Sequence, residues 1–260
     1  MNNEKVQKAI ARLKAFEPAD EPYYLCYSGG KDSDCIRILA DLAGVKHDIV
    51  HNLTTVDAPE TVRYIKSIPN VQIEMPKYSM WQLIEKKKMP PTRLMRYCCD
   101  ELKEKGGKGR IKVTGVRWAE SSNRNNNQSL VTIVGKPKAT IALAEELQAE
   151  YERTPKGGLI LNTDNDENRR MVEQCYRTTS TLVNPIIDWT DFERLARQMT
   201  QISFDSLKPK YKITKPITDI WQVDIGHIEE IMDRERLKAI IREKCKNLYS
   251  VAEERKYYDE

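Results

Sequence analysis

Ser28-Gly29-Gly30-Lys31-Asp32-Ser33, the glycine turn, is the stretch that decides the fold of this chain. The residues before it, Tyr23 to Tyr27, are few, aromatic and apolar, as in a buried strand. After it, apolar residues recur at helical spacing as far as Gly44. The glycine turn is therefore predicted to connect the end of a strand to the start of a helix.

The chemistry of the glycine turn suits an anion. Two adjacent glycines let the backbone approach a ligand closely. The hydroxyls of Ser28 and Ser33 and the N–H groups of the first helical turn can donate to phosphate or sulfate oxygens. The helix dipole and Lys31 also favour negative charge there. The alternative is an ordinary glycine-rich turn with a solvated lysine, but the strand–turn–helix context favours an anion site.

The pattern on both sides of the glycine turn predicts an α/β fold. Apolar residues from Val6 to Phe16 indicate a first helix, and Pro59 is placed to start another. Further strands are expected at residues 47–53, 71–73 and 111–116. Strands that alternate with helices predict a parallel sheet with right-handed crossovers. Ligands of such sheets bind beyond the carboxyl ends of the strands, where the glycine turn and residues 54–61 are both expected.

The second half of the chain is less regular. Residues 125–128, an Asn/Gln run, are interpreted as a loop. The remaining expected elements are a helix at 142–151, a strand at 159–161, a helix capped within 164–167, a strand-to-helix junction at 182–191 with Thr190 as N-cap, a connecting segment at 203–221 and a helical region at 228–241.

Composition narrows the class of protein. The chain has 260 residues, of which 40% are hydrophobic and 32% charged, with a net charge of +4. It can fill a sizeable core, and this charge balance does not predict nucleic-acid binding. The basic run from Lys103 to Lys112 is interpreted as a solvated loop because no aromatic ladder accompanies it. No apolar run approaches the ~20 residues of a membrane span, and the N-terminus lacks the apolar core of a signal peptide. We therefore expect a cytoplasmic protein whose six cysteines are thiols or ligands.

Five short blocks carry a family resemblance. They are the glycine turn, residues 54–61, Arg96-Tyr97-Cys98-Cys99 with Leu102-Lys103, Thr114-Gly115-Val116-Arg117 with Glu120-Ser121 and Arg124, and Asn184-Pro185-Ile186 with Asp188-Trp189-Thr190. In this order they resemble the phosphoadenylyl-sulfate (PAPS) reductase family of the PP-loop adenine nucleotide α-hydrolase-like superfamily, in particular its divergent members in phages and mobile elements. The match spans about residues 23–192.

The resemblance implies a domain organisation and a nucleotide site. It implies a five-stranded type of parallel sheet with helices on both faces in residues 1–192, followed by a divergent C-terminal helical segment in residues 193–260. Arg117 and Arg124 become candidate anion clamps, because guanidinium groups bind phosphate and sulfate bidentately; the alternative is two surface arginines on a polar loop. The implied nucleotide-binding residues are Ser28, Gly29, Gly30, Lys31, Asp32, Ser33, Thr54, Arg117, Glu120, Ser121 and Arg124.

The cysteines agree with the family only in part. In one branch of the family, a Cys-Cys pair and a later Cys-x-x-Cys hold a four-iron iron–sulfur cluster. This chain has Cys98-Cys99 but no Cys-x-x-Cys, so a cluster would need Cys98, Cys99, Cys175 and Cys245. The family's C-terminal nucleophilic cysteine stands beside glycine and histidine, whereas Cys245 stands between two lysines, which would lower its pKa. Cys98, Cys99 and Cys245 are the catalytic candidates, although a spare thiol is the favoured interpretation of Cys245.

Three functions follow from these observations. The first is a reductase in which a cysteine thiolate attacks the sulfur of phosphoadenylyl or adenylyl sulfate, and a thioredoxin-type thiol then releases sulfite. The second is an ATP pyrophosphatase that uses Mg²⁺ and adenylates a substrate for sulfur transfer to RNA or DNA. The third is a nucleotide-binding module without catalysis. A nucleic-acid partner is expected only for the second.

Overall fold

The computed structural model describes residues 4–92, 95–118, 122–187, 189, 192 and 195–200. Its strands are β1 (Tyr23–Cys26), β2 (His47–Asn52), β3 (Val71–Glu74), β4 (Ile111–Val113), β5 (Val131–Val134), β6 (Glu152–Arg153), β7 (Leu159–Leu161) and β8 (Ser180–Val183). Its helices are α1 (Glu4–Ala15), α2 (Lys31–Ala43), α3 (Pro59–Ser67), α4 (Met80–Lys87), α5 (Tyr97–Cys99), the π-helix η1 (Asp100–Glu104), α6 (Ser122–Asn127), α7 (Pro137–Glu146) and α8 (Asp166–Cys175).

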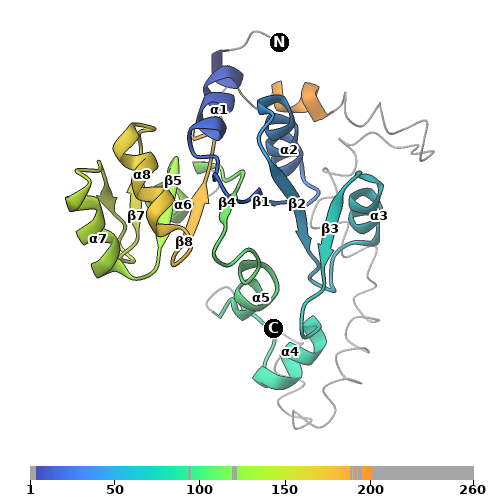
Figure 1. Cartoon of the computed structure of the whole chain (residues 1–260). Coiled ribbons are helices and arrows are strands. Elements are labelled where there is room, and N and C mark those ends of the chain that lie inside the picture. The colour runs from blue at the N-terminus through green and yellow to red at the C-terminus, as the bar shows by residue number, and fades with distance from the viewer. Residues whose placement is uncertain are drawn as a thin grey trace. The chain divides into compact units, whose positions relative to one another are not determined.

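The predicted α/β fold with a parallel sheet is confirmed. The strands form an eight-stranded sheet in the order β3-β2-β1-β4-β8-β5-β7-β6 (Figure 1). The strand β1 pairs in parallel with β2 and with β4, and β4 pairs in parallel with β8. Leu25 lies opposite Ile49 on one side and Val113 on the other, and all three side chains are buried. The central residues of β1, β2 and β4 are buried, as expected for a sheet covered on both faces.

The sheet is larger than the predicted five-stranded type. The strand β5 pairs antiparallel with β8 and β7, and β6 pairs antiparallel with β7. Residues 131–133 of β5 are buried, as are all three residues of β7. The strand predicted at 159–161 is β7, whereas β5 and β6 were not predicted, because segments this short show no clear period.

Two local predictions need correction. Residues 125–127 belong to α6 rather than to a loop, and the Gln128 N–H donates a helical hydrogen bond to the Arg124 carbonyl at 3.0 Å. The helix predicted at 142–151 is α7, which starts earlier, at Pro137, and ends at Glu146. Proline is favoured at the first position of a helix, so Pro137 was the missed signal. The other predicted helices and strands up to residue 183 are confirmed within a few residues of their expected ends.

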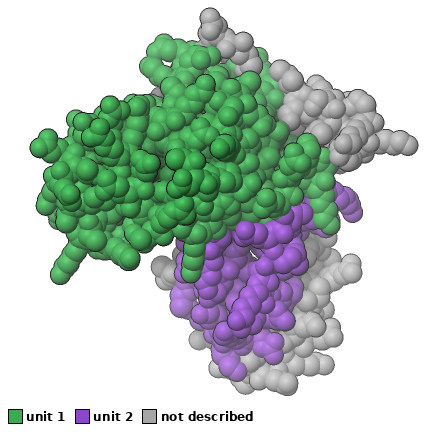
Figure 2. Space-filling model, viewed as in Figure 1, with its two compact units in different colours: residues 1–51, 64–72, 107–214 green, residues 52–63, 73–106, 215–260 purple. Residues whose placement is uncertain are grey.

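Two compact units make up the chain (Figure 2). The described residues of the first unit are 4–51, 64–72 and those from 107 onward, and those of the second are 52–63 and 73–106. The predicted boundary at residue 192 stays a prediction, because most of residues 193–260 lie outside the described part of the chain, as do Thr190 and the segments at 203–221 and 228–241. Among the helices that the structure describes, none has the length and apolar character needed to cross a membrane.

Gly107 provides a direct test of the packing of the first unit. Its φ is +62°, and a Cβ atom there would lie 2.7 Å from Cγ of Tyr24, a buried residue of β1. We expect Gly107→Ala to lower the free energy of unfolding by about 2–4 kcal/mol, because backbone strain and overpacking act together.

Gly157→Ala is the matched control for this substitution. Gly157 has a φ of +81° but no atom within 4 Å of the added Cβ. The control should therefore lose only the backbone contribution of about 1–2 kcal/mol in urea denaturation. Equal losses in the two variants would contradict the packing of Gly107 against Tyr24.

Candidate functional site

The glycine turn connects β1 to α2, as predicted. Gly29 has a φ of +77°, a conformation that glycine adopts without steric cost, and Gly30 is the N-cap of α2. The Ser28 hydroxyl donates to the Ser33 hydroxyl at 3.2 Å, and Ser33 donates to the Gly30 carbonyl at 2.8 Å. The Gly30 N–H donates to Ser28 Oγ at 3.4 Å. The two serines and Gly30 therefore converge on one turn at the carboxyl end of β1.

This turn has the polarity of an anion site. Gly30 has no side chain with which to cap α2, so the first N–H groups of a 13-residue helix are not capped from that position. The positive end of the helix dipole lies there, and half-buried Lys31 is the first residue of the helix. Two acidic residues, Asp32 and Asp34, also occupy the first turn and would repel an anion if their charges were not compensated.

Arg117 compensates Asp32. Its Nε lies 3.1 Å from Asp32 Oδ2, so this predicted anion clamp stands beside the glycine turn. The segment after β4 reaches the helix because residue 115 is glycine. A Cβ at Gly115 would lie 3.1 Å from the Asp32 carbonyl oxygen and 3.0 Å from Cγ1 of Ile36.

The block at residues 184–190 has a role that its sequence did not reveal. The side chains of Asn184 and Trp189 both donate to the Val116 carbonyl, at 2.9 and 3.1 Å. Both residues are buried. They therefore fix the backbone of the residue immediately before Arg117.

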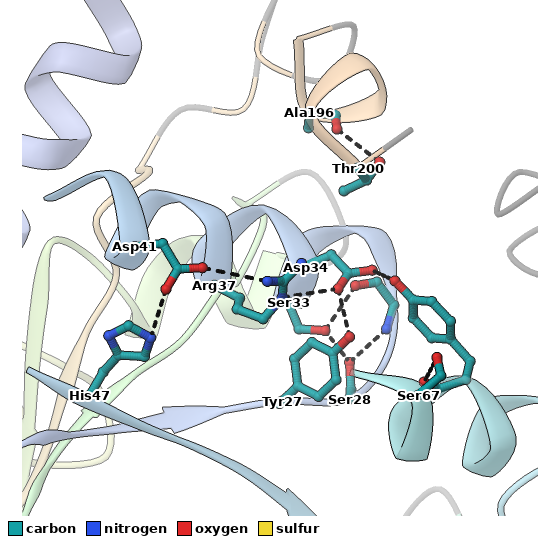
Figure 3. Close-up of polar contacts among 12 residues, drawn as sticks. Tyr27, Ser28, Ser33, Asp34, Arg37, Asp41, His47, Ser67, Ala196 and Thr200 are labelled. Atoms are coloured by element: carbon teal, nitrogen blue, oxygen red, sulfur yellow. Dashed lines mark hydrogen bonds and ion pairs between the residues drawn. The ribbon is translucent and has the colours of Figure 1, made fainter. Parts of the chain in front are cut away.

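Asp34 is compensated differently, inside the protein (Figure 3). Its carboxylate has no solvent exposure and accepts hydrogen bonds from the hydroxyls of Tyr27 and Tyr64, each at 2.6 Å. Arg37 Nε lies 3.6 Å from Asp34 Oδ1. Burial raises the pKa of Asp34, whereas the two tyrosines and Arg37 lower it. Sequence analysis missed this cluster, because nothing in the spacing links Tyr64 to residues 27 and 34.

The other predicted nucleotide-binding residues are divided between the two units, and some lie outside the described part of the chain. Thr54 is buried in the second unit, where its N–H donates to Asp57 Oδ2 at 2.6 Å. Arg124 is half-buried on α6 of the first unit. Glu120 and Ser121 lie outside the described residues. The roles of all these residues remain predictions.

The described cysteines differ in exposure and in the unit to which they belong, and Cys26 is half-buried in the first unit. Cys98 and Cys99 are half-buried on α5 of the second unit, and Arg96 Nη2 donates to Cys99 Sγ at 3.3 Å. Cys35 and Cys175 are buried in the first unit, and burial raises the pKa of both thiols. Within the described ranges, no group of three or more His, Cys, Asp or Glu side chains is arranged to hold a metal ion. Cys245 lies outside those ranges.

A parallel α/β sheet with this turn at the carboxyl end of its strand β1 is the arrangement of a PP-loop nucleotide-binding domain. The phosphoadenosine phosphosulfate reductase domain matches residues 22–197, and the chain belongs to this family. The resemblance inferred from the five blocks is thereby confirmed. A search among curated proteins found no match.

The burial of the thiols predicts an order of alkylation. We expect iodoacetamide at pH 8 to modify Cys98 and Cys99 of the native protein at least about tenfold faster than Cys35 and Cys175, because the reagent cannot reach buried thiols, although burial raises the pKa of Cys98 as well as the pKa values of Cys35 and Cys175. Peptide mass spectrometry over a time course measures the four rates. Labelling in denaturant is the control, and the difference should vanish there. Rapid native labelling of Cys35 would contradict the described core.

Proposed function

We propose that the chain binds an adenine nucleotide in which a sulfate is joined to a phosphate as an anhydride, phosphoadenylyl or adenylyl sulfate, and reduces this sulfate to sulfite with thiol electrons. The observation that carries this proposal is the glycine turn at the start of α2 with Arg117 beside Asp32, in a chain of this family. Oxyanions of phosphate and sulfate bind well to helix N-termini and to guanidinium groups. We place the phosphosulfate at this turn.

The proposed reaction begins with attack of a cysteine thiolate on the sulfate sulfur. The bond from sulfur to the bridging phosphate oxygen breaks, the nucleotide leaves with its phosphate, and a cysteine thiosulfonate forms. A thiol of a thioredoxin-type reductant then attacks the cysteine sulfur and releases sulfite. A second thiol of the reductant resolves the mixed disulfide, so that two thiols supply the two electrons.

Three cysteines are candidates for the nucleophile. Cys98 and Cys99 are half-buried, and the Arg96 guanidinium gives Cys99 a cationic hydrogen-bond donor. Cys245 is the third, on the lysine-flanked sequence described above. An iron–sulfur cluster of Cys98, Cys99, Cys175 and Cys245 is not part of the proposal. That ligand set stays a prediction, because Cys245 lies outside the described residues.

The second candidate is an ATP pyrophosphatase. The departure of Cys245 from the family's glycine- and histidine-flanked tail favours it, because that tail carries the family's reductive chemistry. The glycine turn would then bind the pyrophosphate of ATP together with Mg²⁺, and ATP would adenylate a substrate. Sulfur would afterwards be transferred to RNA or DNA. A module that binds a nucleotide without catalysis is the third candidate.

Product analysis distinguishes these candidates. Anaerobically purified protein is incubated with phosphoadenylyl or adenylyl sulfate and a dithiol reductant such as thioredoxin, and separately with ATP and Mg²⁺. Sulfite in the first reaction supports the reductase, and pyrophosphate in the second supports the alternative. Nucleotide binding in calorimetry without either product supports the module. Failure to bind any of the three nucleotides contradicts all of them.

Arg117→Ala tests the anion clamp. We expect nucleotide binding to weaken by about 1.5–3 kcal/mol in calorimetry, because a charge-assisted hydrogen bond is lost. Removal of Arg117 also leaves the Asp32 carboxylate uncompensated beside the ligand. Arg177→Ala is the control: Arg177 is half exposed and pairs with Asp20 and Glu21 at 3.7 and 3.5 Å. Unchanged affinity in Arg117→Ala would remove Arg117 from the site.

A further inference from the structure

We infer that Tyr27 and Asp34 are positioning residues that hold the glycine turn in its binding conformation. They are the two residues that directly flank residues 28–33. The Tyr27 hydroxyl donates to Asp34 Oδ1 at 2.6 Å, so a side-chain bond joins the two ends of the turn (Figure 3). The inference rests on the proposed function in one respect, namely that the positioned turn binds a nucleotide.

Tyr27 is fixed at three points. Its N–H donates to the Val50 carbonyl at 2.9 Å, and its own carbonyl accepts from His51 Nδ1 at 2.9 Å. Its hydroxyl supplies the third contact, to Asp34. Val50 and His51 belong to β2, so two contacts tie Tyr27 to the sheet and the third ties it to α2. The residue that precedes Ser28 therefore has a defined position and orientation.

Asp34 fixes the other end. Its N–H donates to the Gly30 carbonyl at 3.0 Å, which is the first helical hydrogen bond of α2. Its second carboxylate oxygen accepts from Tyr64, so the carboxylate cannot rotate without breaking a bond to one of the tyrosines. Arg37 lies close enough to compensate its charge. All of these groups belong to the first unit.

Within the turn, the Ser33 bond to the Gly30 carbonyl is short, at 2.8 Å, but the bonds of Ser28 are longer than the bond that joins Tyr27 to Asp34. The hydrogen bonds that Ser28 makes to Ser33 and to Gly30 measure 3.2 and 3.4 Å, and Ser28 is exposed. Longer hydrogen bonds at an exposed position hold a backbone less firmly than a short, buried, charge-assisted one. A turn fixed at both ends loses less conformational entropy when a ligand binds, which increases affinity.

Tyr27→Phe tests the inference, and Tyr23→Phe is its matched control. Tyr23 is also buried on the β1 side of the turn, and its hydroxyl donates to the Leu13 carbonyl at 2.8 Å, away from the glycine turn. Each variant thus removes one buried hydroxyl and one hydrogen bond. Three quantities are measured for both: the thermal midpoint, amide hydrogen exchange of residues 28–33, and the Kd for phosphoadenylyl sulfate.

We expect Tyr27→Phe to lower the thermal midpoint at least as much as Tyr23→Phe, because it removes a hydrogen bond from a buried carboxylate, and we expect only Tyr27→Phe to change the turn. In Tyr27→Phe, exchange of the amides of residues 28–33 should accelerate about tenfold, and Kd should rise about fivefold or more. In Tyr23→Phe, both should stay within about twofold of the wild type. Asp34→Asn, which keeps the size of the side chain, should reproduce the faster exchange. It replaces Tyr27→Phe as the test if Tyr27→Phe does not fold.

The two possible failures are distinguishable. Equal exchange rates at residues 28–33 in Tyr27→Phe and Tyr23→Phe would overturn the positioning role, as would faster exchange with an unchanged Kd. If the wild type does not bind phosphoadenylyl sulfate, the proposed substrate is wrong. The exchange measurement still decides in that case whether Tyr27 and Asp34 hold the turn.

Discussion

A carboxylate without solvent exposure must find all of its partners inside the protein, and Asp34 is such a carboxylate. Two tyrosine hydroxyls and a nearby guanidinium satisfy it. These partners come from three places: Tyr27 follows β1, Arg37 lies on α2, and Tyr64 lies on α3. The need to satisfy one buried charge therefore fixes the end of a strand and two helices relative to one another. The glycine turn lies between Tyr27 and Asp34, so the bond between these two residues fixes both of its ends.

The sequence predicted the parts of the fold that depend on local chemistry. Adjacent glycines between an apolar run and an amphipathic run define a strand–turn–helix unit, and Gly29 indeed has a positive φ. Pro59 begins α3 where proline at the first position of a helix predicts it. The parallel arrangement of β1, β2 and β4 followed from the alternation of expected strands with expected helices.

The parts that were missed depend on contacts between residues far apart in the chain. The strand β5 exists because Val131 and Ile133 pair with residues of β7 and β8 some 26–52 positions later. Helix α6 contains three consecutive asparagines, which have poor helix propensity, and tertiary context overrides that preference. The bonds from Asn184 and Trp189 to the Val116 carbonyl cross about 70 positions. No local pattern encodes the partner of such a residue, so the supporting residues of the site were not predictable although its central turn was.

The charges at the glycine turn favour binding of an anion, but they do not determine which reaction the bound anion undergoes. A helix N-terminus, a lysine and an arginine bind the oxygens of phosphate and sulfate alike, because they interact with the charged oxygen atoms and not with the phosphorus or sulfur atom. The same turn would therefore suit a phosphosulfate anhydride and a triphosphate. What happens to the bound group depends on a nucleophile, and the candidate cysteines belong to other parts of the sequence: Cys98 and Cys99 are residues of the second unit, and Cys245 follows the matched residues 22–197. A change of such a nucleophile need not disturb Asp34, whose hydrogen bonds come from the hydroxyls of Tyr27 and Tyr64. Anion binding should therefore be the more robust property of this chain, and its reaction class the more variable one.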